Sequence, residues 1–372
     1  MEISELGEFG LIKRLTENIA PRNASTERGV GDDCAVLNYG GPNRLLVTTD
    51  MLMEGIHFDL QYTPLRHLGW KSVIVNLSDI YAMMGTPRQI TVSLALSKRF
   101  TVEDIEELYA GMRMACEAHH VDLVGGDTTS SLTGLAISIT AIGEVAPEDI
   151  VYRSGAQPND LICVSGNLGA AYMGLQLMER EKQIYNSQVS EIQKNMARAK
   201  AEGDEKTLSS LNRQLSELDF QPDFSGREYL LERQLRPEAR GDIAKALRNA
   251  GIRPTAMMDI SDGLSSELLH ICTRSQTGCR IYEERLPLDY QTAVMAEELN
   301  MNVSTCALNG GEDYELLFTV PLTDNDRVSQ IPDVRVIGYI TEEKLGRALI
   351  CRDGSEFELK AQGWNPLKNA NQ

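Results

Sequence analysis

The sequence predicts an α/β (α+β) protein of two domains, and three observations lead to this prediction. Strand-like and helix-like patterns alternate through both halves of the chain. A stretch rich in glycine, proline and polar residues at 147–158 interrupts the alternation and has the composition of a linker. The 372 residues also exceed the ~150 residues of a typical domain. We therefore expect an N-terminal domain at 1–148 and a C-terminal domain at 149–372.

The first half begins with a β-prone run at 44–49 that stops at Asp50. A helix is expected from Thr63, because a proline follows it at the first helical position and Gly85 lies beyond the end. Apolar residues alternate at 88–97, which predicts a half-buried strand.

A capping-box pattern at 101–104 then predicts a helix to about His119. Short and long strands follow at 121–124, ending in Gly-Gly-Asp, and at 134–145.

The second half continues the alternation. Pro237 suits the start of a helix, and another helix is expected after Gly169. Further strands are expected at 161–164, 255–258, 314–320 and 334–340.

A polar insertion at about 185–223 interrupts this half of the chain. Four leucines at 208, 211, 215 and 218 follow a 3-4-3 spacing, and Gly203 divides the segment, which predicts a helical hairpin. The hairpin is either a surface insertion without chemistry or an arm that contacts a partner or a second copy. The pattern leaves its role open.

Composition excludes several classes of function. Against 36 Lys+Arg stand 54 Asp+Glu, a formal net charge of -18, which argues against nucleic-acid and anionic-membrane partners. The chain has neither a signal-peptide pattern nor an apolar run of ~18 residues, so we expect a cytoplasmic protein. Its seven cysteines are scattered, which predicts reduced thiols without a disulfide framework or zinc site.

Aspartates recur where predicted strands end or loops begin: Asp32, Asp33, Asp50, Asp127, Asp259 and Asp262. Asp79 lies instead on a predicted apolar helix, where a charged group needs a partner. Converging carboxylates without a Cys/His cluster favour Mg²⁺ over Zn²⁺. Taken singly, each loop aspartate also suits a turn or a helix cap.

The common nucleotide and nucleophile motifs are absent. Without a Gly-Lys dipeptide there is no P-loop, and the His-Arg-Asp, Asp-Phe-Gly and Gly-x-Ser-x-Gly signatures are missing. The residues alone therefore support only an acidic site that depends on Mg²⁺.

Eight ordered blocks make the chain similar to a known family. They lie at 31–35, 48–50, 57–58, 75–79, 125–129, 153–155, 259–263 and 310–315. Together they resemble the thiamine-monophosphate kinase family, in the aminoimidazole ribonucleotide synthetase-like superfamily. The resemblance covers nearly the whole chain, although the stretch at about 185–223 looks longer than is usual in the family.

The resemblance implies two α/β domains, with the N-terminal sheet paired with its copy in a homodimer. It implies ATP-dependent phosphorylation of thiamine monophosphate to thiamine diphosphate, the final step of that biosynthesis. ATP and several Mg²⁺ ions would lie between the domains, and no protein nucleophile would be needed.

The resemblance also implies the site residues. The metal ligands would be Asp33, Thr48, Thr49, Asp50, Asp79, Asp127, Asp259 and Asp262, with Asp32 adjacent. ATP would contact Tyr109, Gly126, Asp127, Arg153 and Ser261. Thiamine monophosphate would contact His57, Glu312 and Trp364.

These residues also have plain structural interpretations: a strand-end residue for His57, a turn acid for Glu312 and a packing aromatic for Trp364.

Other interpretations remain open. A selenophosphate synthetase would carry a reactive cysteine in a glycine-rich N-terminal segment, whereas the first cysteine here is Cys34. A hydrogenase-maturation relative would end in a cysteine-bearing tail, and this sequence ends Lys-Asn-Ala-Asn-Gln. An aminoimidazole ribonucleotide synthetase shares the Mg-ATP aspartates. A non-catalytic module would bind Mg-ATP without turnover, and an interaction scaffold would leave the aspartates unexplained.

Overall fold

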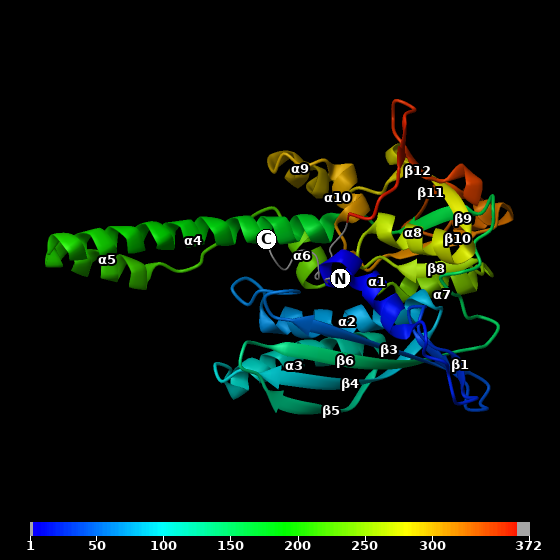
Figure 1. Cartoon of the computed structure of the whole chain (residues 1–372), viewed down its shortest axis with the longest axis horizontal. Helices are drawn as coiled ribbons and strands as arrows, with labels where there is room; N and C mark the ends of the chain where they lie inside the picture. Colours follow the sequence, from blue (N-terminus) through cyan, green and yellow to red (C-terminus); the bar gives the residue numbers. More distant parts are fainter. Residues whose placement is uncertain (1–2, 363–372) are drawn as a thin grey trace.

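Two β-sheets and the helices around them make up the protein, as a computed structural model of residues 3–362 describes it (Figure 1). The first sheet has six strands in the order β1-β2-β3-β6-β4-β5. The second has seven strands in the order β13-β12-β9-β11-β7-β10-β8. The mixed α/β class predicted from the sequence is confirmed.

The elements of the first half surround the first sheet. They are α1 (Ile3–Thr16), β1 (Thr26–Arg28), β2 (Ala35–Leu37), β3 (Arg44–Met53), α2 (Leu65–Ala82), β4 (Thr86–Leu96), α3 (Val102–His119), β5 (Asp122–Ser130) and β6 (Ala136–Val145). The predicted capping box at the start of α3 is present, with Thr101 and Asp104 exchanging hydrogen bonds. Pro64 is the N-cap of α2 and not its first helical residue.

The elements of the second half build the second sheet and its helices. They are β7 (Leu161–Ser165), α4 (Ala170–Glu202), α5 (Glu205–Glu217), α6 (Glu228–Leu235), α7 (Gly241–Asn249), β8 (Ala256–Asp259), α8 (Leu264–Ser275), β9 (Thr277–Tyr282), η1 (Glu283–Arg285), α9 (Tyr290–Glu298), α10 (Val303–Asn309), β10 (Leu316–Val320), η2 (Leu322–Asp324), α11 (Asn325–Val328), β11 (Val334–Glu342), η3 (Glu343–Leu345), β12 (Arg347–Ile350) and β13 (Glu356–Glu358).

Three predicted boundaries are wrong. Strand β3 continues through Asp50, which is paired with Ile139 of β6. Strand β5 continues through the Gly-Gly-Asp segment, because its ladder with β4 resumes at Gly125 after an irregularity at Val124, with Gly126 opposite Val92. Pro237 does not start a helix but lies between α6 and α7, where its carbonyl accepts a hydrogen bond from the Trp70 indole.

Helix α2 is the central element of the molecule. It packs on β3, β4 and β6 on one side and on β8, α6 and α7 on the other, so it lies between the two sheets (Figure 1). Most of its side chains are therefore buried, charged Lys71 included. Groups on α2 can reach both halves of the protein, which makes this helix the scaffold for a site between them.

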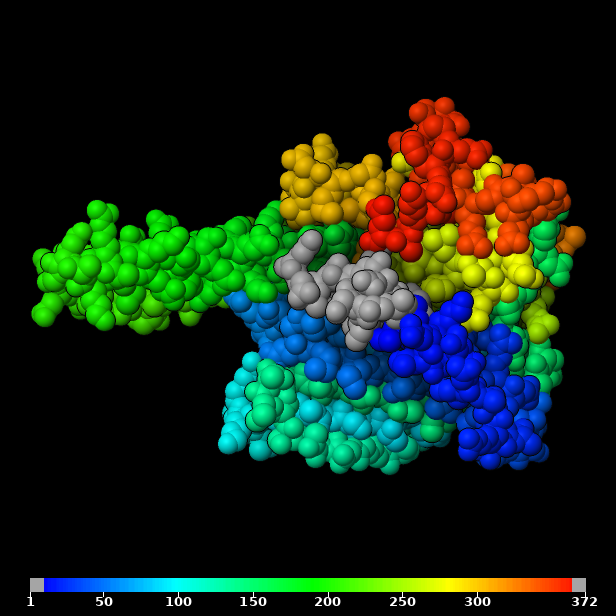
Figure 2. All heavy atoms as spheres, in the orientation of Figure 1, coloured from blue at the N-terminus to red at the C-terminus, as the bar shows by residue number. Residues whose placement is uncertain are grey.

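The predicted helical hairpin is confirmed. Helix α4 runs without interruption to Gly203, whose φ of +73° ends it in the left-handed conformation that glycine adopts freely. Helix α5 returns along it, and its leucines are half-buried (Leu208, Leu211 and Leu215). Figure 2 shows this hairpin projecting from the body of the molecule.

Within residues 3–362 we find no helix with the length and apolarity needed to cross a bilayer. All seven cysteines are free, as their scattered spacing predicted.

Candidate functional site

Three carboxylates meet between the two sheets. Asp33 comes from the loop before β2, Asp79 from α2 and Asp259 from the end of β8. One oxygen of each lies within 4.8 Å of the others. The cluster therefore joins segments that are more than 200 residues apart in the chain.

Hydrogen bonds fix these carboxylates in place. Thr48 donates from its hydroxyl to Asp79, and Ser78 donates to Asp259 over 2.6 Å. The Arg153 guanidinium donates to Oδ1 of Asp33 over 2.7 Å.

Oδ2 of Asp33 is buried and accepts no hydrogen bond within the described part of the chain, so it has a lone pair available to a ligand.

The electrostatics of the cluster favour a bound cation. Burial raises the pKa of Asp79 well above its usual value, and the charges of Asp50, Asp259 and Asp33 raise it further. Burial and neighbouring Asp33 raise the pKa of Asp259 to about 7, although its bond from Ser78 opposes this. Burial also raises the pKa of Asp33, and Arg153 counters it. A cation would keep these carboxylates ionised by compensating their mutual repulsion.

The donor set suits a hard divalent ion. Its atoms are carboxylate oxygens with hydroxyls beside them, which are the ligands that Mg²⁺ accepts. Together with the unsatisfied oxygen of Asp33, this chemistry fits Mg²⁺, and Asp33, Asp79 and Asp259 are the residues that would hold it.

Asp32 and Asp50 lie beside the cluster. The backbone N–H of Arg153 donates to Asp32 over 2.9 Å, and Arg28 forms an ion pair with the same carboxylate. Asp50 lies close enough to raise the pKa of Asp79. Its backbone N–H donates to Asn76 of α2.

Ser261 and Asp262 occupy the turn between β8 and α8. The carbonyl of Ser261 accepts a hydrogen bond from the Glu312 backbone N–H over 2.7 Å. The Asp262 N–H donates to the buried carboxylate of Glu267. This turn therefore connects the carboxylate cluster to the segment that carries Glu312.

His57 and Glu312, predicted to contact one substrate, lie close enough for their charges to interact. Burial lowers the pKa of His57, Glu312 opposes this shift, and Lys71 adds to it, so the three groups interact electrostatically. The Lys71 ammonium lies 2.8 Å from one Glu312 oxygen, and the Gln234 amide donates to the other over 2.7 Å.

Four predicted residues lie elsewhere in the single chain. Thr49 points to the sheet face opposite Thr48, where its hydroxyl donates to the Ile139 carbonyl. Gly126 and Asp127 lie on the exposed edge strand β5. Tyr109 is half-buried on α3. Trp364 is outside the described residues.

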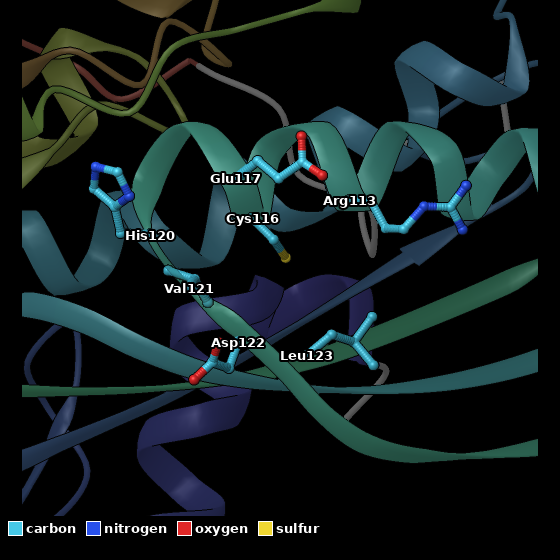
Figure 3. Close-up of a pocket in the computed structure, with 7 residues that line it drawn as sticks. All are labelled: Arg113, Cys116, Glu117, His120, Val121, Asp122 and Leu123. Carbon is cyan, nitrogen blue, oxygen red and sulfur yellow. The ribbon is translucent and has the colours of Figure 1, made fainter.

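Two surface pockets lie along α3, away from the cluster. One of about 480 Å³ is lined by Tyr109 together with Leu96, Phe100 and Ile105. The other, of about 540 Å³, lies between α3 and the start of β5, and Figure 3 shows Arg113 and Glu117 on its helical side. The Tyr109 pocket is mostly apolar, which suits a flat ring better than a phosphate.

Sequence reasoning missed three residues around the site. They are Lys71, Ser78 and Glu267, each of which is buried and bonded to a predicted site residue. Lys71 gave one signal that was overlooked, because a lysine within an apolar helix needs a partner as much as Asp79 does.

Comparisons with known proteins agree with this geometry. Residues 31–145 match the family described as AIR synthase related protein, N-terminal domain. The thiamine-monophosphate kinase of Aquifex aeolicus (strain VF5) is 34% identical over 364 residues, which cover 98% of this chain and 99% of that protein. The thiamine-monophosphate kinase of Bacillus subtilis (strain 168) is 30% identical over 369 residues, covering 98% and 100%.

The solved structure of AaThiL complexed with AMPPCP and TMP superposes with a TM-score of 0.77 at 32% identity and covers 98% of each chain. The similarity thus extends over both sheets and the cluster between them. The chain belongs to the thiamine-monophosphate kinase family.

Proposed function

We propose that this protein transfers the γ-phosphoryl group of ATP to thiamine monophosphate and so forms thiamine diphosphate. One observation carries the proposal: three carboxylates converge between the sheets with Arg153 beside them, and the turn that follows Asp259 is hydrogen-bonded to Glu312, whose charge acts on His57. The family membership and the relative solved with AMPPCP and TMP support the same reaction.

The reaction requires little acid–base catalysis by the protein. The acceptor is a phosphate monoester with a second pKa of ~6, so it is largely ionised at neutral pH and needs no strong base. The main obstacle is the repulsion between two anions that must approach in line. A protein nucleophile is not required.

Mg²⁺ would neutralise and align the two phosphates when bound to Asp33, Asp79 and Asp259. Ser78 and Thr48 hold two of these carboxylates in fixed orientations. The Arg153 side chain, partly exposed, holds Asp33 and keeps donors for a phosphate oxygen. Asp50, Asp262 and Thr48 are proposed as further ligands, whereas the Thr49 side chain faces the other side of the sheet and is not among them.

The acceptor would lie with its phosphate at the cluster and its rings towards His57 and Glu312. Glu312 would complement the positive charge of the thiazolium or bond the aminopyrimidine. Trp364 is proposed to stack on the cationic ring, a contact worth ~0.5–2 kcal/mol.

The remaining expectations belong to the same proposal. ATP would contact Tyr109, Gly126, Asp127 and Ser261. Because β5 is an exposed edge strand, a homodimer formed through the first sheet would cover it. The domains are proposed to divide at 148/149.

The test is Mg²⁺-dependent formation of thiamine diphosphate, identified by chromatography, with thiamine and an aminoimidazole ribonucleotide precursor as parallel acceptors. We expect thiamine diphosphate to form from thiamine monophosphate, and no product to form from either of the other two acceptors. Glu312→Gln and Trp364→Ala should weaken acceptor affinity more than ATP affinity. Binding of Mg-ATP without turnover of thiamine monophosphate would overturn the proposal in favour of a binding module.

A further inference from the structure

Lys71 is a buried cation with a defined set of partners. Its side chain is 4% exposed, on a helix most of whose residues are buried. The ammonium lies 2.8 Å from a Glu312 oxygen and donates to the Gln234 carbonyl over 3.2 Å. Burying an ammonium is costly, so these two contacts compensate much of its lost hydration.

Glu312 is constrained from several directions. Its φ of +57° lies in the left-handed region that non-glycine residues rarely adopt, directly after Gly311. Its backbone N–H is bonded to Ser261, and both of its carboxylate oxygens are engaged, by Lys71 and by Gln234. Three elements therefore define one position for this carboxylate: α2, α6 and the segment 310–315.

Helix α2 carries both Lys71, which binds Glu312, and Asp79 of the carboxylate cluster. Asp79 of the cluster follows Lys71 by eight residues, which is about 12 Å along the helix axis. A rigid helix thus sets the separation between the carboxylate cluster and the Glu312 carboxylate. A substrate held at both places would meet two anchor points at a fixed spacing.

We propose that Lys71 is a positioning residue for the acceptor: it holds the Glu312 carboxylate at a fixed distance from the Asp79 cluster, so that the end of the acceptor remote from its phosphate binds in one place. The inference rests on the proposed function and deepens it. Lys71 acts through Glu312 and need not touch the substrate.

A double-mutant cycle tests this relationship. Lys71→Met should raise KM for thiamine monophosphate about tenfold, with kcat and the KM for ATP changed less than about twofold. Lys71→Arg keeps a cation and should recover part of the loss. In the Glu312→Gln background, Lys71→Met should add no further change, because its partner is already neutral.

Arg66→Met is the matched control. Arg66 lies on the same helix and pairs with Glu107 at the surface, far less buried than Lys71, so its loss should leave both KM values unchanged. Additive effects of Lys71→Met and Glu312→Gln, or equal losses for both substrates, would overturn the inference.

Backbone amide exchange separates this inference from the proposed function. Lys71→Met, but not Arg66→Met, should speed exchange in the segment 310–315, whatever the substrate is. If Lys71→Met does not fold, Lys71→Gln, which removes the charge but keeps a polar group, takes its place in this measurement. An enzyme inactive on thiamine monophosphate would refute the proposed function, whereas unchanged exchange in this segment would refute the positioning role.

Discussion

The Ser78 hydroxyl donates a hydrogen bond to the Asp259 carboxylate over 2.6 Å, and both residues are buried. Ser78 belongs to α2, which packs on the first sheet, and Asp259 ends β8 of the second sheet. This hydroxyl thus joins the two halves of the molecule at the carboxylate cluster, as the Arg153–Asp33 ion pair also does. The stability of the protein and the geometry of its site are coupled at this bond.

Ser78→Ala should therefore destabilise the protein by about 1–3 kcal/mol, because it leaves a buried carboxylate without its donor. Ser72→Ala is a matched control, since Ser72 is equally buried on α2 but donates only to the Gly69 carbonyl of its own helix. Urea unfolding of both variants measures the difference. Equal losses would mean that the bond across the halves has no special energetic role.

Asp79→Asn should separate metal binding from folding. Without divalent ions, the three adjoining carboxylates repel one another when they are ionised. Replacing one of them with a neutral amide removes this repulsion and should raise the free energy of unfolding by about 1 kcal/mol or more. The wild-type protein should gain stability on addition of Mg²⁺, and the variant should gain much less. Thermal unfolding with EDTA and with Mg²⁺ measures both effects. A variant that is stabilised by Mg²⁺ as strongly as the wild type would show that Asp79 is not a ligand.

The sequence allowed the mixed α/β class and most of the local elements to be predicted. Thr101 marks the start of α3 and Gly203 marks the end of α4. Both boundaries could be predicted because the caps of a helix depend on residues next to them in the sequence. The ends of β3 and β5 were misjudged because the ladders of Asp50 with Ile139 and of Gly126 with Val92 override local turn preferences.

Prediction of the site was likewise limited by contacts between residues far apart in the sequence. The aspartate blocks indicated Asp33, Asp79 and Asp259, which the fold brings together. The partners of these blocks could not be inferred, because Lys71 meets Glu312 only after residues 241 positions apart in the chain are folded against each other. A spacing pattern carries no information on such contacts.

Asp313 should give the protein a pH-dependent stability. Burial raises the pKa of Asp313 to about 7, although Arg233 and the Gly169 N–H oppose the shift. A carboxyl whose pKa is higher in the folded than in the unfolded state binds more protons when folded. Its contribution to stability is full below about pH 4 and is lost as the pH rises towards 7.

Asp313→Asn removes this titration while keeping an oxygen for the Gly169 N–H. Relative to the wild type, the variant should gain about 2 kcal/mol between pH 5 and pH 7, since one pKa unit corresponds to about 1.4 kcal/mol. Denaturant unfolding of both proteins at several pH values provides the comparison. A difference that does not change with pH would show that Asp313 is ionised throughout.

The long hairpin should divide into a part that serves the site and a part that does not. Near the body, Glu179 of α4 accepts a hydrogen bond from the Tyr62 hydroxyl over 2.6 Å, and Lys182 pairs with Asp59 over 2.8 Å. Asp59 and Tyr62 follow His57 in the same loop. Glu179→Gln should therefore weaken thiamine monophosphate binding about two- to fivefold, with ATP affinity kept.

Deleting residues 188–217, the distal part of the hairpin, should leave substrate binding unchanged. Helix α5 has no fully buried side chain, and the Tyr185 and Phe220 rings that flank the deletion lie 5.7 Å apart, so a short Gly/Ser linker can close the chain. We expect kcat/KM for both substrates to stay within about twofold, as for other peripheral insertions. Steady-state kinetics and analytical ultracentrifugation of the shortened protein measure activity and assembly together. If the full-length protein sediments as the proposed homodimer and the shortened protein loses this assembly together with its activity, the distal hairpin would be assigned to a contact with a second copy. Helix α5 buries its leucines only in part against α4 and leaves their outer edges for such a contact.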